Sequence, residues 1–262
     1  MKLLFVGDVI GKPGRRAVTR LLPQLIERHT IDYTVVNIEN AAGGFGVTAE
    51  VIAELEKLPI DCFTSGNHIW DKKEGVQLLE VYPRLLRPAN YPAGNPGSGL
   101  YRGESAAGVP VAVINLEGCV FMKSLESPFS VADQLLSSLG SEVKVILVDF
   151  HAEATSEKQA LGFYLDGRVS AVLGTHTHVP TADERVLPGG TALLTDVGMT
   201  GPYDGIIGFR TDKVLRRFQL QTNVPFEVAR GDVRLAAAVM DVDELTGRTR
   251  SIERLLVPDP GA

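Results

Sequence analysis

The stretch KLLFVGDVIGKPGRRAVTRLLPQLIERHTIDYTVVNIEN, residues 2–40, decides the fold. It contains an apolar run over 2–9, a helical pattern over 12–29 and a second apolar run over 33–40. Two continuously apolar strands joined by a helix are typical of a βα unit whose strands are buried on both faces. The stretch therefore predicts an α/β protein.

The same alternation continues towards residue 180. Helical patterns cover 48–58, 71–82, 128–139 and 156–167, and apolar strand-like runs cover 61–68, 109–118, 143–153 and 169–178. A Gly/Pro/Asn-rich loop is expected over 92–105. Beyond residue 180 the pattern favours strands or hairpins, at 191–198, 213–221, 226–231 and 233–257, with a turn at Thr246-Gly247. No repeat or linker divides the chain, so we expect a single domain over 1–262.

Composition excludes several classes of protein. The chain has 262 residues, of which 44% are hydrophobic and 22% charged, as in an ordinary globular protein. A net charge of −6 gives no broad basic surface for duplex nucleic acid, although a local basic groove stays open. Gly7 and Asp8 interrupt the first apolar run too early for a signal peptide, and no stretch is apolar enough to span a bilayer. Cys62 and Cys119 have no paired spacing, so we expect reduced thiols and a cytoplasmic protein without membrane association.

Polar side chains follow five of the predicted strands. In an open α/β sheet, ligands bind outside the carboxyl ends of the strands, so side chains at those ends converge. Four of the five histidines belong to this set, and only His29, at the end of the first helical pattern, is interpreted as a surface cation. The set consists of Asp8, Glu39, Asn40, Asn67, His68, His151, His176 and His178.

Each of these residues also has a structural explanation by itself. Asp8 could cap the following helix, and Asn67 could adopt a left-handed conformation beside Gly66. His176 and His178 sit at a predicted strand end, where alternate residues share a face, so we expect them to project side by side. Together, however, so many imidazoles and carboxylates in one crevice would leave buried polar groups unpaired unless cations satisfied them.

The donor types indicate which ions would bind. Three imidazoles, two carboxylates and a carboxamide, without a thiolate, favour Fe or Mn, with Zn as the alternative. The set exceeds what one catalytic ion uses. We therefore predict two neighbouring divalent ions that share a carboxylate.

Five motifs, in this order, resemble the calcineurin-like metallophosphoesterase superfamily, and within it the bacterial YmdB-like branch of cyclic-nucleotide phosphodiesterases. They are GDVIG (7–11), NIENAAGGFG (37–46), GNHIWD (66–71), VDFHAEATSEK (148–158) and GTHTHVPTAD (174–183). The stretch TDVGMTGP (195–202) also fits this branch. The resemblance implies a four-layered α/β sandwich with a dimetal site at the C-terminal ends of the strands.

The resemblance also implies roles for the residues. Asp8 and His178 would bind one ion, and Glu39 would bridge the two. His68 would contact the scissile phosphate and protonate the leaving oxygen. The second ion would be held by Asn67, His151 and His176.

One position departs from the superfamily pattern. A histidine usually stands two residues after the first aspartate, and this chain has Ile10 there. Asn40, next to the bridging carboxylate, would fill the vacancy.

The expected reaction is hydrolysis of a phosphodiester, such as a 2′,3′- or 3′,5′-cyclic nucleotide, by attack of a metal-bridging hydroxide with His68 as general acid.

Two other functions are compatible with the same residues. One is a phosphomonoesterase, and the other is a regulatory, RNA-associated protein that binds phosphate ligands without turnover.

The loop around Phe45 would form a mobile flap through Gly43, Gly44 and Gly46, and Trp70 would stack on a base. Alternatively, both aromatic rings would pack against neighbouring loops. The sequence specifies neither the substrate-binding residues nor the oligomeric state, for which a homo-oligomer is one alternative.

Overall fold

The computed structural model describes residues 1–261 and begins with the predicted βα unit. Strand β1 (Lys2–Val6) and strand β2 (Tyr33–Asn37) are parallel neighbours joined by helix α1 (Gly11–His29). Thr30, with φ of 52°, ends α1, and its backbone N–H donates to a carbonyl of the last turn.

The first sheet has six strands and mixes two directions. Its order is β10-β11-β1-β2-β3, and β12 pairs with β11. β1, β2 and β3 (Cys62–Thr64) are parallel, whereas β11 (Val233–Val242) runs antiparallel to β1. β11 and β12 (Thr249–Pro258) form the hairpin predicted over 233–257, and β10 (Gly201–Pro202) extends the sheet.

The second sheet also has six strands, in the order β4-β5-β6-β7-β9-β8. The inner strands are parallel: β5 (Pro110–Glu117), β6 (Val145–His151), β7 (Ala171–Thr175) and β9 (Ala192–Leu194). The two edge strands are antiparallel to their neighbours: β4 (Leu100–Glu104) and β8 (Arg185–Val186).

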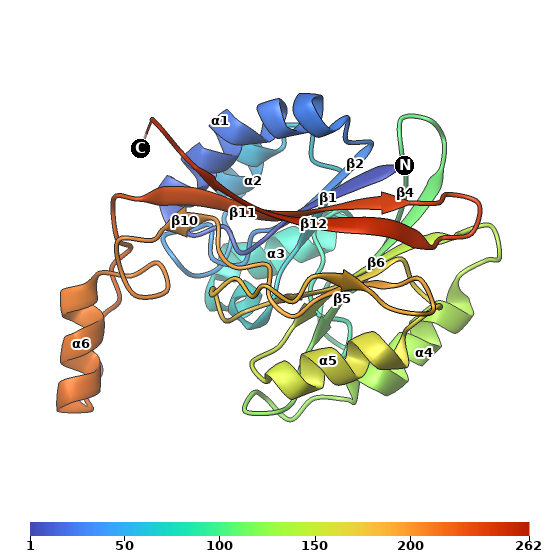
Figure 1. Ribbon diagram of the computed structural model, residues 1–262. Coiled ribbons are helices and arrows are strands. Elements are labelled where there is room, and N and C mark those ends of the chain that lie inside the picture. The colour runs from blue at the N-terminus through green and yellow to red at the C-terminus, as the bar shows by residue number, and fades with distance from the viewer. Residues whose placement is uncertain (262) are drawn as a thin grey trace.

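Helices lie on opposite sides of the two sheets. Figure 1 shows α1 and α2 (Ala49–Leu55) beside the first sheet, and α4 (Pro128–Ser138) and α5 (Thr155–Tyr164) beside the second. A 3-10 turn, η1 (Asn67–Asp71), and α3 (Lys73–Val81) follow β3. Helix α6 (Thr211–Leu220) projects from the body. None of the helices in residues 1–261 has the length and apolar character needed to cross a membrane.

Three clusters of buried apolar side chains hold these elements together. Successive strand residues point to opposite faces, so Leu4 of β1 packs towards α1 and α2 while Phe5 packs towards the second sheet. The cluster that contains Phe5 also contains Val113 and Leu147 of the second sheet. A third cluster joins the other face of that sheet to α4 and α5. The strands are thus buried on both faces, as their continuous apolar runs predicted.

The structure corrects the sequence-based prediction in three segments. The run 213–221, predicted as a strand, lies mostly within α6, and 226–231 contains no strand. α6 is amphipathic, but only Val214 is buried while Leu215 and Phe218 are exposed, so the segment was assigned the strand period although it is a helix. The loop predicted over 92–105 contains the edge strand β4, whose residues are half-buried or exposed.

Candidate metal centre

The two sheets bring the eight predicted residues to the carboxyl ends of their strands. Asp8 follows β1, Glu39 and Asn40 follow β2, and Asn67 and His68 lie in η1 directly after β3. The second sheet contributes the rest: His151 is the last residue of β6, and His176 and His178 follow β7.

One group of donors surrounds the His151 ring. Its Nε2 lies 3.2 Å from Glu39 Oε1 and 3.0 Å from Asn67 Oδ1. His176 Nδ1 lies 3.0 Å from the same Nε2 atom. Two imidazole nitrogens, a carboxylate oxygen and an amide oxygen therefore face one another, which is a donor set suited to Fe, Mn or Zn.

A second group consists of Asp8, Glu39 and His178. One donor atom from each residue lies within 4.8 Å of the other two, and the same holds for Glu39, His151 and His176. Glu39 belongs to both groups, as the prediction of a shared carboxylate requires. The geometry therefore allows two neighbouring cations with Glu39 between them.

The buried oxygens of the site fit this requirement. Asp8 and Glu39 are 0% exposed and Asn40 is 1% exposed. Among residues 1–261, Asp8 Oδ1 and Asn40 Oδ1 have no hydrogen-bond partner, and Glu39 Oε1 has only the 3.2 Å approach of His151 Nε2. A buried acceptor without a partner costs about 1–3 kcal/mol, and a bound cation removes that cost. Asn40 Nδ2 donates to the carbonyl of Gly44, which leaves its Oδ1 as the atom available to a ligand.

The pKa shifts of the buried carboxylates and of His151 also indicate a site for positive charge. Burial raises the pKa of Asp8 well above its ordinary value. Burial also acts to raise the pKa of Glu39, but the charge and hydrogen bond of His151 outweigh it and lower that pKa to about 2. Burial acts to lower the pKa of His151, yet Glu39, Asp8 and Asp149 together raise it to about 9. The carboxylates therefore favour a cation at the centre of the cluster.

The other two imidazoles are held in the neutral form that binds metals. Burial, followed by the charge of His151, lowers the pKa of His176 to about 3. Burial is also the main cause that lowers the pKa of His178. His178 Nδ1 lies 3.0 Å from the carbonyl of Ile207, which orients the ring.

His176 and His178 were predicted to project side by side from a strand, but they do not. β7 ends at Thr175, and His176 and His178 have φ angles of 98° and 66° in the loop that follows. The left-handed backbone turns His176 towards His151 and His178 towards Asp8, so each ring joins a different donor group. Strand alternation would have placed them on one face.

A buried ion pair supports this loop. Asp196 accepts hydrogen bonds from the backbone N–H and the hydroxyl of Thr177, the residue between the two histidines. The same carboxylate lies 2.6 Å from Nζ of Lys158, and both side chains are almost completely buried. Asp196 belongs to the motif TDVG, but its role was not predicted.

Sequence reasoning also missed Asp149 and Thr175, which orient His151. Thr175 Oγ1 lies 2.9 Å from His151 Nδ1 and donates to Asp149 Oδ1 at 2.7 Å. Asp149 stands two residues before His151 on β6, and therefore on the same face of the strand, which was a signal available in the sequence.

His68 lies at the rim of the centre rather than inside it. Its side chain is 27% exposed, and its backbone N–H donates to Glu39 Oε2 at 3.0 Å. His68 Nδ1 lies 2.7 Å from a carboxylate oxygen of Asp71. This hydrogen bond leaves Nε2 available to a ligand at the centre. Asp71 also lies in the motif GNHIWD and was not predicted to have a role.

Both aromatic rings considered as substrate contacts pack against protein groups. Phe45 stacks on Phe209 with ring centroids 5.2 Å apart and presents its ring to His68 at 4.9 Å. Trp70 packs against Tyr91 at 4.9 Å. The glycines around Phe45 have φ angles between 72° and 103°, which only glycine adopts readily. The loop thus holds Phe45 against His68.

Comparison with known proteins identifies the family. A family described as YmdB-like protein matches residues 4–255. The chain belongs to the YmdB-like family. This confirms the resemblance carried by the five motifs.

Individual relatives of this YmdB-like chain match almost end to end. The protein named 2′,3′-cyclic-nucleotide 2′-phosphodiesterase of Bacillus subtilis (strain 168) is 48% identical over 259 residues, which cover 99% of this chain and 98% of the relative. A crystal structure of a hypothetical protein from Thermus thermophilus has a TM-score of 0.93 and 43% identity, covering 99% of this chain and 100% of that one. A crystal structure described as a novel phosphatase from Mycoplasma pneumoniae has a TM-score of 0.91 and 33% identity, covering 100% and 95%.

Proposed function

We propose that this protein is a dimetal phosphodiesterase that hydrolyses cyclic nucleotides, with 2′,3′-cyclic nucleotides as the first candidates and 3′,5′-cyclic nucleotides as the second. The observation that carries the proposal is the pair of donor groups that share Glu39. The name of the Bacillus subtilis relative supports the choice of substrate. The protein is thus a phosphoric ester hydrolase that acts on a small molecule.

The ligands divide between two ions. Asp8, Asn40 and His178 would hold one, and Glu39 would be shared. Asn67, His151 and His176 would hold the other, because their donor atoms meet around His151 Nε2. Fe or Mn fits these nitrogen and oxygen donors best, with Zn as the alternative. When bound, the two ions would supply Lewis-acid stabilisation of phosphoryl charge and would lower the pKa of an attacking water.

His68 is the proton donor to the leaving oxygen. Its side chain is partly exposed at the rim, and the hydrogen bond between Asp71 and Nδ1 directs Nε2 away from that carboxylate. Phe45 packs against the other side of the ring and limits its rotation. General acid catalysis of this kind contributes about 10²–10⁴ in rate, most where the leaving group is a poor one such as a ribose alkoxide.

A phosphomonoesterase on the same centre is the second candidate, because the relative from Mycoplasma pneumoniae is described as a phosphatase. Both reactions use the same metals. They differ in whether the phosphate carries a second ester group. The assay below separates them.

The finer predictions about the whole molecule stay proposals. We propose a single domain with four layers, helices outside and the two sheets inside, which the three apolar clusters support. A cytoplasmic location and a homo-oligomeric state stay predictions from the sequence.

The decisive experiment combines metal analysis with substrate comparison. Wild type, Glu39→Gln and the exposed control Glu56→Gln are analysed for bound metal and assayed with 2′,3′-cyclic AMP, bis-p-nitrophenyl phosphate and p-nitrophenyl phosphate. We expect two ions per chain and preferential diester hydrolysis in wild type and Glu56→Gln. Glu39→Gln should lose both metal and activity, because it removes the shared donor. Preferential turnover of p-nitrophenyl phosphate would favour the monoesterase, and full metal content in Glu39→Gln would overturn the ligand assignment.

A further inference from the structure

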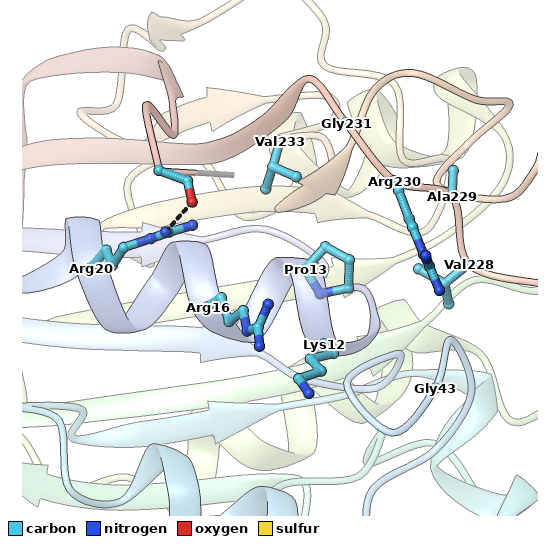
Figure 2. A pocket seen from close by; sticks show the side chains of 11 residues that line it. Lys12, Pro13, Arg16, Arg20, Gly43, Val228, Ala229, Arg230, Gly231 and Val233 are labelled. Carbon is cyan, nitrogen blue, oxygen red and sulfur yellow. Dashed lines mark hydrogen bonds between the residues drawn. The ribbon is translucent and has the colours of Figure 1, made fainter.

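A cavity lined by cationic side chains lies beside the N-terminal half of α1. Four cationic residues, Lys12, Arg16, Arg20 and Arg230, line a cavity of about 560 Å³, which we call the basic pocket. Figure 2 shows the first three along α1 and Arg230 on the segment that faces them, with Gly43 at the edge of the pocket. None of the predicted metal donors lines it.

The cations of the basic pocket differ in how they are paired. Arg20 contacts the carboxylate of Asp259 and the carbonyl of Gly261. Within residues 1–261, Lys12, Arg16 and Arg230 have no ion pair and no side-chain hydrogen bond. Three positive charges are therefore available to a ligand, whereas the charge of Arg20 is already paired.

The like charges on α1 repel one another weakly, and an anion between them would remove that repulsion. Lys12, Arg16 and Arg20 are spaced four residues apart, so they lie on one face of α1, where like charges repel. The neighbouring Arg15 is paired with Glu54, and Arg20 with Asp259, but among residues 1–261 no Asp or Glu side chain lines the basic pocket. Although the chain has 32 acidic residues, none of those in the described part forms an ion pair with Lys12 or Arg16. A bound anion would supply the missing charge.

The size and lining of the pocket indicate the class of anion. A volume of about 560 Å³ is that of a small-molecule site, and Pro13, Val228 and Val233 provide an apolar wall beside the cations. The net negative charge of the rest of the protein disfavours a long polyanion such as an RNA strand. A small molecule that combines an apolar ring with more than one phosphate fits both observations.

We propose that the basic pocket binds a nucleoside diphosphate. The phosphates lie between Lys12, Arg16 and Arg230, and the nucleoside packs against Val228 and Val233. The site is separate from the metal centre, so the proposal does not depend on the proposed catalytic function. Arg230 also borders a neighbouring cavity that Asp204 lines, so its contribution is smaller than that of the two residues on α1.

The test is isothermal titration of the metal-loaded protein with ADP, pyrophosphate, adenosine, sulfate and a six-nucleotide RNA. The double variant Lys12→Gln/Arg16→Gln is compared with the control Lys57→Gln/Arg216→Gln, which removes two exposed cations elsewhere. We expect ADP to bind more tightly than pyrophosphate, adenosine or sulfate. Affinity for ADP should fall about tenfold or more in the pocket variant, less in Arg230→Gln and not in the control.

Two further measurements separate this site from the metal centre. Glu39→Gln should bind ADP as wild type does, and the Lys12→Gln/Arg16→Gln protein should hydrolyse 2′,3′-cyclic AMP normally. Absence of ADP binding, equal binding of sulfate, or loss of ADP binding in Glu39→Gln would overturn the proposal. Tighter binding of the RNA, sensitive to the pocket variant, would replace the nucleotide with a nucleic acid strand. Failure of catalysis would leave these binding results unaffected.

Discussion

The two sheets contribute different atoms to the metal centre. The first sheet supplies oxygen donors, from Asp8, Glu39 and Asn67, and the second supplies imidazole nitrogens, from His151, His176 and His178. Each donor group mixes atoms from both sheets. Because each donor group draws on both sheets, its geometry depends on the apolar cluster that packs one sheet against the other.

The largest predicted effects come from removing one donor on each side of this comparison. Asp8→Ala, on the first sheet, and His176→Ala, on the second, should each reduce bound metal and lower kcat/KM by at least about 10³-fold, because dinuclear catalysis needs both ions. Elemental analysis and diesterase assays measure both quantities. His29→Ala, the histidine at the end of α1, is the matched control and should behave as wild type. Unchanged metal content in either donor variant would contradict the proposal that both sheets supply metal ligands.

Removal of the proton donor should be the next largest effect. His68→Ala should retain metal but lose about 10²–10⁴ in kcat with 2′,3′-cyclic AMP, because the alkoxide then leaves unprotonated. The loss should be much smaller with bis-p-nitrophenyl phosphate, whose leaving group needs no proton. An equal loss with both substrates would argue against a role as general acid.

Stability should respond to the support of the histidine loop. Lys158→Met leaves Asp196 buried without its partner, and we expect a loss of about 3–5 kcal/mol in the free energy of unfolding. The control is Arg168→Met, which breaks the half-exposed pair with Asp133 and should cost about 0–1 kcal/mol. Urea denaturation measures both values. A similar small loss in the two variants would mean that the Lys158 pair does not brace the second-sheet ligands.

The smallest predicted effect concerns the orientation of His68. Asp71→Asn keeps a polar side chain of similar size but weakens the hydrogen bond to Nδ1. We expect about a tenfold decrease in kcat with metal content and KM unchanged. Glu74→Gln, three residues further along, provides an exposed control. A change in metal content would place Asp71 with the ion-binding residues instead.

The sequence predicted the parts of the molecule where buried strands alternate with amphipathic helices. This pattern is strong in residues 2–183 because the strands are apolar on both faces, and it placed the polar residues at the strand ends correctly. It failed for α6, an amphipathic helix that was assigned the strand period and that buries only Val214 of its apolar residues. It also failed for β4, an edge strand of mostly exposed or half-buried residues.

Within the site, residue types were easier to predict than backbone conformation. The sequence GTHTH does not indicate the left-handed φ angles of His176 and His178. Strand alternation therefore placed the two rings on one face, which was wrong. The orienting residues Asp71, Asp149 and Asp196 were missed for another reason. Asp149 could have been found from strand alternation with His151, whereas the partners of Asp71 and Asp196 depend on turn and loop conformations that the sequence pattern does not specify.

The position of β11 in the sheet determines how late during synthesis the first sheet can be completed. This late strand pairs with β1 in the first sheet, although Leu4 and its partner Val239 are separated by most of the chain. The strand that ends beside Asp8 therefore lacks one neighbour until the last fifth of the polypeptide has been synthesised. The segment that carries Asp8 would therefore reach its final position only after that late insertion, so we expect a chain truncated before β11 to bind the ions more weakly than the full chain.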